Sequence, residues 1–140
     1  MPGQVVSKQV VYVDTSAFLA VLDASDVYHH RAADLWRELL QSGASLACSS
    51  YVLVETSALI QRRLGVEALR AFREDVYPIL NIFWVDAPIH ESAVDAVLAA
   101  NRRELSLVDC VSFLVMRRRG LKRVFTFDRH FAEQGFEVLG

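Results

Sequence analysis

The chain has 140 residues, 53% of them hydrophobic, which suits one domain with its own core and excludes an intrinsically disordered protein. Its net charge is −2, from 15 basic and 17 acidic residues, so the basic excess typical of nucleic-acid-binding proteins is missing. That balance does not exclude such a function, because an acidic site lowers the total and bound metal ions restore it.

The first elements are predicted from short apolar runs and cap residues. Val10–Val13 is an apolar run bounded by polar residues, which predicts a buried strand. Asp14-Thr15-Ser16 is expected to cap a helix through Leu22. A second helix is expected over residues 29–41, with Asp26 as its cap and Gly43 as its stop. We expect its inner face to carry Ala33, Trp36 and Leu40.

The middle of the chain repeats this alternation. Residues 46–48 are a second strand candidate, and Ser49 or Ser50 is expected to cap an apolar helix that ends at Leu64, before Gly65. An amphipathic helix is predicted over residues 66–77, where Pro78 fixes its end.

The last part begins with a predicted strand over residues 82–85. Pro88 opens a helix through Ala100, and its inner face is expected to carry Val94, Val97 and Leu98. Ser106 can cap the next helix, to Arg119, which is apolar almost all round and is therefore expected to be central. Strands are predicted over residues 124–127 and 136–139. Because short apolar strands alternate with helices, we expect an α/β fold with a parallel sheet covered on both faces.

Cysteine usage and hydropathy suggest the compartment. Cys48 and Cys110 lie in apolar segments without a CxxC partner, so we expect reduced core residues and a reducing, cytoplasmic setting. Val10–Val13 is too short for a signal peptide, and no run approaches the roughly 18 apolar residues of a membrane span.

Four acidic residues interrupt or end apolar runs, namely Asp14, Glu55, Asp109 and Asp128. Buried carboxylates are costly unless their charge is compensated. If the fold brings them together, each pair about 4 Å apart repels by roughly 4 kcal/mol at an effective dielectric of about 20. A hard divalent cation such as Mg²⁺ or Mn²⁺, which prefers oxygen ligands, would relieve this repulsion.

The predicted elements allow the four acids to meet. Asp14 and Asp128 fall at the carboxyl ends of strands, the edge where ligands bind in open α/β sheets. Asp109 falls in the first turn of a buried helix, and Glu55 lies one and a half turns into another. The neighbouring hydroxyls could orient these carboxylates or bind metal-held water, and they belong to Thr15, Ser16 and Thr126.

Each aspartate also has a purely structural explanation. Asp14, Asp109 and Asp128 could each be a helix cap or a first-turn charge. Glu55 has no such explanation, since it is mid-helix on an apolar face without a basic residue three or four positions away. His130 could approach a phosphate or serve in packing.

Basic residues are bunched in several places, and at least one of these clusters is expected to face a substrate although most are explained as solvated helix ends. The clusters comprise Arg117–Arg119 with Lys122 and Arg123, Arg62 with Arg63, Arg102 with Arg103, and Arg70 with Arg73.

The motifs that carry these acids resemble those of PIN domains, most closely the VapC-type ribonuclease toxins of prokaryotic toxin–antitoxin pairs. The matching motifs, in order, are Val-Asp-Thr-Ser-Ala-Phe at 13–18, Glu-Thr-Ser-Ala at 55–58, Leu-Ser-Leu-Val-Asp at 105–109 and Thr-Phe-Asp at 126–128. The likeness covers the chain from residue 10 onward. Cys110 departs from it, because a small residue such as Ala is more usual there.

The resemblance implies a three-layer α/β/α sandwich around a parallel sheet, as a single nuclease domain over residues 1–140. It implies an endoribonuclease that depends on Mg²⁺ or Mn²⁺, with Asp14, Glu55, Asp109 and Asp128 as the catalytic set. We expect Asp14, Asp109 and Asp128 to hold one metal, and Glu55 with Asp14 to share a second. Hydrolysis would leave a 5′-phosphate and a 3′-hydroxyl. The implied partners are an RNA substrate, a cognate antitoxin protein and a second copy in a homodimer, with no membrane.

Two other readings remain open. A catalytically inactive PIN-like module would bind RNA or protein without cutting, and loss of one or more acids would be its signature. An aspartate-based phosphatase or phosphotransfer domain would use a strand-end aspartate as nucleophile. Asp14-Thr15-Ser16 lacks the second aspartate that a haloacid-dehalogenase-like phosphatase needs two positions later.

Overall fold

The computed structural model describes residues 9–140. The expectation that the N-terminus is not a signal peptide concerns in part residues 1–8, which lie outside the described residues. The strands form one parallel sheet in the order β3-β2-β1-β4-β5. Their bounds are Val10–Val13 (β1), Ser45–Ser49 (β2), Leu80–Phe83 (β3), Arg123–Phe125 (β4) and Glu137–Leu139 (β5). Since β1 lies in the middle with later strands on both sides, the strand order reverses there, and this is the place where open α/β sheets bind ligands.

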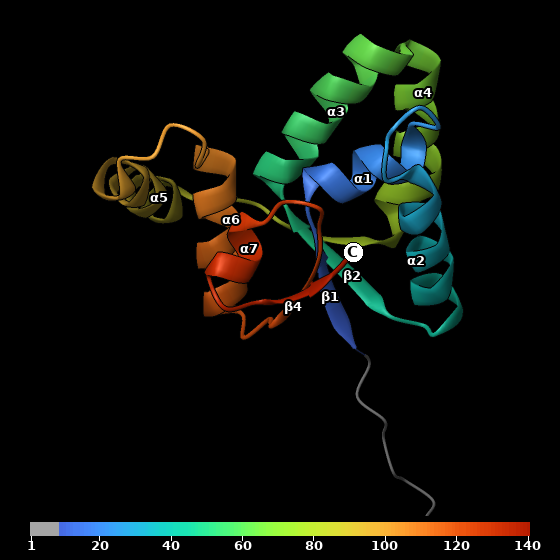
Figure 1. Cartoon of the computed structure of the whole chain (residues 1–140). Helices are drawn as coiled ribbons and strands as arrows, with labels where there is room; N and C mark the ends of the chain where they lie inside the picture. Colours follow the sequence, from blue (N-terminus) through green and yellow to red (C-terminus); the bar gives the residue numbers. More distant parts are fainter. Residues whose placement is uncertain (1–8) are drawn as a thin grey trace, which may run out of the picture.

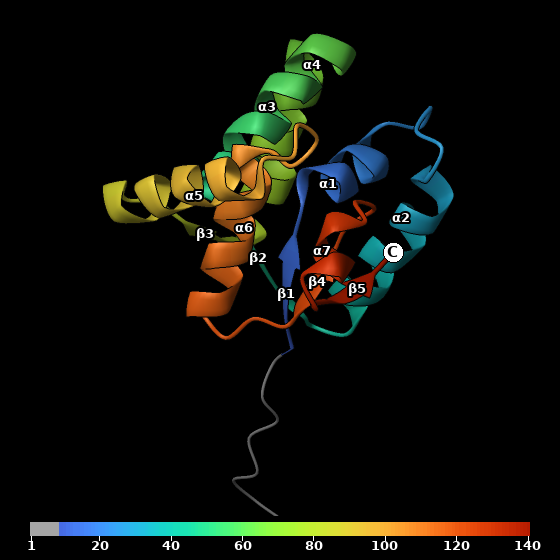
Figure 2. The same ribbon diagram turned by 60° about the vertical axis from the view of Figure 1, so that its left-hand side comes forward.

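Helices cover both faces of the sheet, which makes the three-layer sandwich that the resemblance implied. Their bounds are Thr15–Leu22 (α1), His29–Gln41 (α2), Ser50–Leu64 (α3), Val66–Ala71 (α4), Ala87–Ala100 (α5), Leu107–Arg118 (α6) and His130–Glu133 (α7). In Figures 1 and 2, α1, α2 and α4 lie on one side of the sheet, and α5, α6 and α7 on the other. Helix α3 leaves the carboxyl end of β2 and contacts both α1 and α6.

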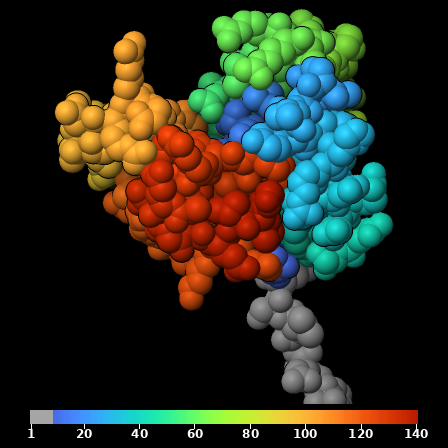
Figure 3. All heavy atoms as spheres, viewed as in Figure 1, coloured from blue at the N-terminus to red at the C-terminus, as the bar shows by residue number. Residues whose placement is uncertain are grey.

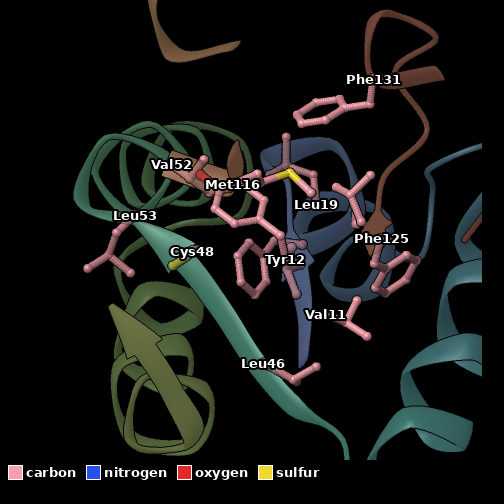
Figure 4. Close-up of a cluster of buried hydrophobic side chains, with 14 of the residues drawn as sticks. Val11, Tyr12, Leu19, Leu46, Cys48, Val52, Leu53, Met116, Phe125 and Phe131 are labelled. Atoms are coloured by element: carbon pink, nitrogen blue, oxygen red, sulfur yellow. The ribbon is translucent and has the colours of Figure 1, made fainter. Parts of the chain in front are cut away.

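The core centres on β1, whose last three residues are fully buried. Figure 4 shows Tyr12 of this strand in the same buried cluster as Cys48 of β2 and Met116 of α6. The buried Tyr12 hydroxyl is hydrogen-bonded to Ser112 Oγ at 2.7 Å and accepts from Ser49 N–H at 3.2 Å. These bonds join β1, β2 and α6 through one side chain. Cys48 and Cys110 are both free and buried, as predicted.

Most predicted elements are confirmed, but two strands end earlier than predicted. The strand predicted over residues 82–85 runs from Leu80 to Phe83, because the Val85 N–H leaves the sheet and donates to Ser50 Oγ at 2.9 Å. The strand predicted over residues 124–127 ends at Phe125. Beyond it, the Phe127 N–H donates to Ser16 Oγ at 2.9 Å. In both places a side-chain hydroxyl, and not the neighbouring strand, accepts the backbone hydrogen bond.

The helix predicted over residues 66–77 is divided. Helix α4 ends at Ala71, a π-helical turn follows over Phe72–Val76, and a 3₁₀ turn over Tyr77–Ile79 contains Pro78. The π turn buries both Phe72 and Val76. Pro78 therefore lies inside the last turn of this segment and not just beyond a single helix.

The predicted inner faces of two helices were shifted. In α2 the buried residues are Ala32, Leu35 and Leu39, while Leu40 is exposed and Trp36 contacts Phe18 from the edge of the core. In α5 only Ala93 is buried, and Leu98 is 71% exposed because this helix packs on α6 and not on the sheet. Asp26 was also wrongly predicted as the cap of α2, since Tyr28 holds that position and Asp26 Oδ1 accepts from the Tyr28 N–H.

Among residues 9–140, no helix combines the length and the apolar character needed to cross a bilayer.

Candidate metal centre

The four predicted acids come from four different elements that meet at the carboxyl edge of the sheet. Asp14 directly follows β1, and Asp128 lies shortly after β4. Asp109 is in the first turn of α6, and Glu55 is in the second turn of α3. Figure 3 shows this edge from outside as a notch, in which blue atoms of the β1–α1 region lie between green α3 and the red C-terminal segment.

Asp14 is the most deeply buried of the four acids, at 4% exposure. Its Oδ2 accepts hydrogen bonds from Ser16 Oγ at 2.8 Å and from Thr126 Oγ1 at 3.0 Å, and it also caps α1. Burial is the largest cause that raises the pKa of Asp14 to about 6; the negative charges of Asp109 and Asp128 add to the rise, and the two hydroxyls oppose it. Asp109 and Asp128 therefore lie close enough to Asp14 for their negative charge to act on it.

Asp109 is fixed by a capping box at the start of α6. Its N–H donates to Ser106 Oγ at 3.0 Å, and its Oδ2 accepts from the Ser106 N–H at 3.2 Å. Burial raises the pKa of Asp109, and the charge of Asp128 raises it further. The capping explanation for Asp14 and Asp109 is therefore correct, and both carboxylates lie in the acidic cluster as well.

Asp128 begins the turn that leads into α7. Its N–H donates to Thr126 Oγ1 at 2.9 Å, and its Oδ1 accepts from the His130 N–H at 2.9 Å. Asp109, Asp128 and His130 each offer one ligand atom, and these three atoms all lie within 4.8 Å of one another. This trio is the tightest part of the cluster.

Glu55 approaches the cluster from α3 and is half-buried. Burial raises the pKa of Glu55, the Thr15 hydroxyl lowers it, and the charge of Asp14 raises it. Thr15 is itself buried and accepts a hydrogen bond from Thr56 Oγ1 at 3.2 Å. Glu55 therefore lies close enough to Asp14 for the two charges to interact.

The cluster has no cationic partner within the part of the chain that the structure describes. The lysine and arginine ion pairs found there all involve other acids, and the imidazole of His130 is the one basic group against Asp128. Carboxylates whose pKa values are raised by one another need a counter-charge when ionised. Oxygen donors converging in this way fit a hard divalent cation.

The three predicted hydroxyl residues all lie beside the acids. One further residue of the cluster, His130, is not among the metal ligands predicted from the sequence. Ser16 and Thr126 bond to Asp14, and Thr15 lies beside Glu55. The sequence leaves His130 either approaching a phosphate or serving in packing; it is buried and lies against Asp128, and an approach to phosphate stays a prediction. Its spacing of two residues from Asp128, at the start of a short helix, is the sequence signal that could have identified it.

Comparison with known proteins identifies the family. The family model for the PIN domain matches residues 11–137. The chain is 33% identical over 128 residues to a Mycobacterium tuberculosis protein described as 23S rRNA-specific endonuclease VapC20, which covers 91% of this chain and 95% of that protein. A VapC ribonuclease of Aquifex aeolicus is 24% identical over 131 residues, covering 91% of this chain and 93% of the other.

Solved structures give the same result. The crystal structure of M. tuberculosis VapC20, described as a Sarcin-Ricin loop cleaving toxin, matches with a TM-score of 0.76 over 90% of this chain and 95% of that chain. FitAcB from Neisseria gonorrhoeae, at 15% identity, shares the fold with a TM-score of 0.68 over 93% of this chain and 96% of that one. With the acidic edge of the sheet, these matches establish that the chain belongs to the PIN-domain family, in its VapC branch.

Proposed function

We propose that this protein is a metal-dependent endoribonuclease and acts as the toxin of a type II toxin–antitoxin pair. The observation that carries the proposal is the convergence of Asp14, Asp109 and Asp128 with Glu55 at one edge, with no lysine or arginine paired to them in residues 9–140. The kinship with VapC ribonucleases supports the same reaction class.

Mg²⁺ or Mn²⁺ would be held by Asp14, Asp109 and Asp128, and Glu55 with Asp14 could share a second ion. When bound, the metal supplies Lewis acidity that lowers the pKa of water and offsets charge on a phosphate. The hydroxyls of Ser16 and Thr126 hold the Asp14 carboxylate in one orientation. The capping box holds Asp109 against its helix, so little reorganisation accompanies binding.

Where no second ion is bound, Glu55 would act on the attacking water instead. Its raised pKa and half-buried position suit a group that accepts a proton from the attacking water or orients that water. In-line attack on phosphorus would then yield a 5′-phosphate and a 3′-hydroxyl. Because the relative that shares 33% identity is described as 23S rRNA-specific, ribosomal RNA is the first substrate to test.

We also propose two protein partners, a cognate antitoxin and a second copy of this chain. Two features support them: kinship with toxins of such pairs, and exposed apolar residues on α3 and at the start of α4. Val54 is 65% exposed and Val66 58% exposed. Light scattering of the purified chain tests the dimer, which requires about twice the 15.8 kDa chain mass.

The nuclease proposal is tested by incubating 23S rRNA with the wild-type protein, with Asp109→Asn and with an exposed control, Asp34→Asn. Wild type and control should cleave in Mg²⁺ or Mn²⁺, EDTA should stop cleavage, and Asp109→Asn should lose at least about a hundredfold in rate because a ligand charge is missing. End mapping should find 5′-phosphates. A folded Asp109→Asn protein that cleaves at the wild-type rate contradicts the assignment.

The inactive binding module predicts the opposite outcome in the same assay. Such a module would retain RNA in a gel-shift experiment with wild type and with Asp109→Asn alike, without cleavage in any divalent ion. The presence of all four acids in one cluster favours the nuclease over this reading.

A further inference from the structure

His130 has the surroundings of a metal ligand more than those of a packing residue. It begins α7 and is only 6% exposed. Neither of its ring nitrogens has a hydrogen-bond partner among the described residues, although both are buried. A buried polar atom left unpaired is destabilising, so an unpartnered imidazole beside the carboxylates of Asp109 and Asp128 points to a missing ligand.

The contact between His130 and Asp128 supports the same conclusion. His130 Nδ1 lies 2.8 Å from Asp128 Oδ1, which is a hydrogen-bond distance, yet the pair lacks hydrogen-bond geometry. The Asp128 oxygen instead accepts from the backbone N–H of His130. A ring nitrogen and a carboxylate oxygen that are close but not hydrogen-bonded have the arrangement of two neighbouring ligands of one ion.

The spacing of the trio fits this arrangement. The ligand atoms of Asp109, Asp128 and His130 lie within 4.8 Å of one another. Opposite ligands of an ion with bonds of about 2.1 Å are separated by about 4.2 Å, and adjacent ones by less. The three side chains can therefore reach one ion with small adjustments.

We propose that His130 supplies a nitrogen ligand to the divalent ion held by Asp109 and Asp128, and that this ligand biases the site toward Mn²⁺ over Mg²⁺. Imidazole suits transition metals, whereas carboxylate and water oxygens serve Mg²⁺ equally well. The inference rests on the proposed function only in assuming that this cluster binds a divalent ion.

The direct test is pulsed electron paramagnetic resonance of Mn²⁺ bound to the full-length protein. A coordinated imidazole gives a resolved ¹⁴N coupling, and this coupling should disappear in His130→Gln. The matched control is His30→Gln, which changes an exposed histidine on α2 and should leave the signal intact. A Mn²⁺ spectrum without directly bound nitrogen in the wild type overturns the proposal, as does a coupling that persists in a folded His130→Gln protein.

Calorimetric titration with Mn²⁺ alone and with Mg²⁺ alone measures the selectivity. The ratio of Mn²⁺ to Mg²⁺ affinity should fall about tenfold or more in His130→Gln. His130→Asp replaces the nitrogen by a hard oxygen ligand, so its ratio should fall at least as far while Mg²⁺ binding is retained. An unchanged ratio in both variants contradicts the bias.

The same samples separate this proposal from the nuclease proposal. If the wild type cleaves RNA in a metal-dependent way but shows no nitrogen coupling, only the role of His130 is wrong. If Mn²⁺ binds with the nitrogen coupling but RNA stays intact, the ligand assignment stands and the nuclease proposal fails.

Discussion

Asp14 shows how a single residue can serve the fold and the proposed metal site at the expense of stability. It caps α1 and bonds two hydroxyls, yet its buried position beside other acids raises its pKa to about 6. The folded protein therefore binds a proton on Asp14 more tightly than the unfolded chain does, whose carboxyl has the ordinary value of 3.8. This contribution to stability is present below pH 4 and is lost as the pH rises through 6.

Replacing Asp14 by Asn removes the charge while keeping a similar shape. In EDTA at pH 7.5, Asp14→Asn should raise the free energy of unfolding by about 1–3 kcal/mol, and the gain should vanish as the pH approaches 4. Urea denaturation across this pH range measures the effect. Asp86→Asn, at the exposed cap of α5, serves as the control without such a trend. A metal-free Asp14→Asn protein less stable than wild type at pH 7.5 would contradict the predicted repulsion.

At the scale of elements, helix caps place the acids. Ser106 forms the capping box of α6 and holds Asp109 through two hydrogen bonds. Ser106→Ala should cost about 1 kcal/mol of stability. It should also weaken Mn²⁺ binding about tenfold, because the carboxylate loses a fixed orientation. Asp86→Ala removes the cap of α5 instead, a helix that carries none of the four acids, so it is the comparison for a cap outside this cluster. Equal Mn²⁺ affinity in Ser106→Ala and wild type would show that the box is only structural.

The helices and strands also show what could be predicted from the sequence. The run Val10–Val13 and the caps Ser49 and Ser106 are local signals, and the structure confirms them. The inner face of α2 was misjudged because Trp36 is large and apolar, although it packs at the core edge. The early ends of β3 and β4 depend on the Ser50 and Ser16 hydroxyls, which are distant in sequence.

The candidate site divides in the same way. The four acids could be identified from the sequence because each interrupts or ends an apolar run. The three hydroxyl residues could be identified because they lie next to or near these acids in the sequence. The proposed ligand role of His130 could not be predicted from the sequence, because it depends on burial and on unpartnered ring nitrogens, which only the packed structure reveals.

In the whole molecule, the fold brings together carboxylates from segments that are about a hundred residues apart in the sequence. The sheet order puts β1 beside β4, and α6 and α7 lie on the same side of the sheet. That topology brings Asp14, Asp109 and Asp128 to one edge, where they act on one another electrostatically. Like charges held together by the fold are relieved by a divalent ion, which links metal binding to stability.

Anomalous diffraction from crystals of the protein soaked in Mn²⁺ shows directly whether these acids bind one ion. We expect a manganese peak at the carboxyl edge of the sheet, about 2.1–2.2 Å from carboxylate oxygens of Asp14, Asp109 and Asp128. A well-occupied manganese peak elsewhere on the protein, with these three carboxylates unliganded, would contradict it.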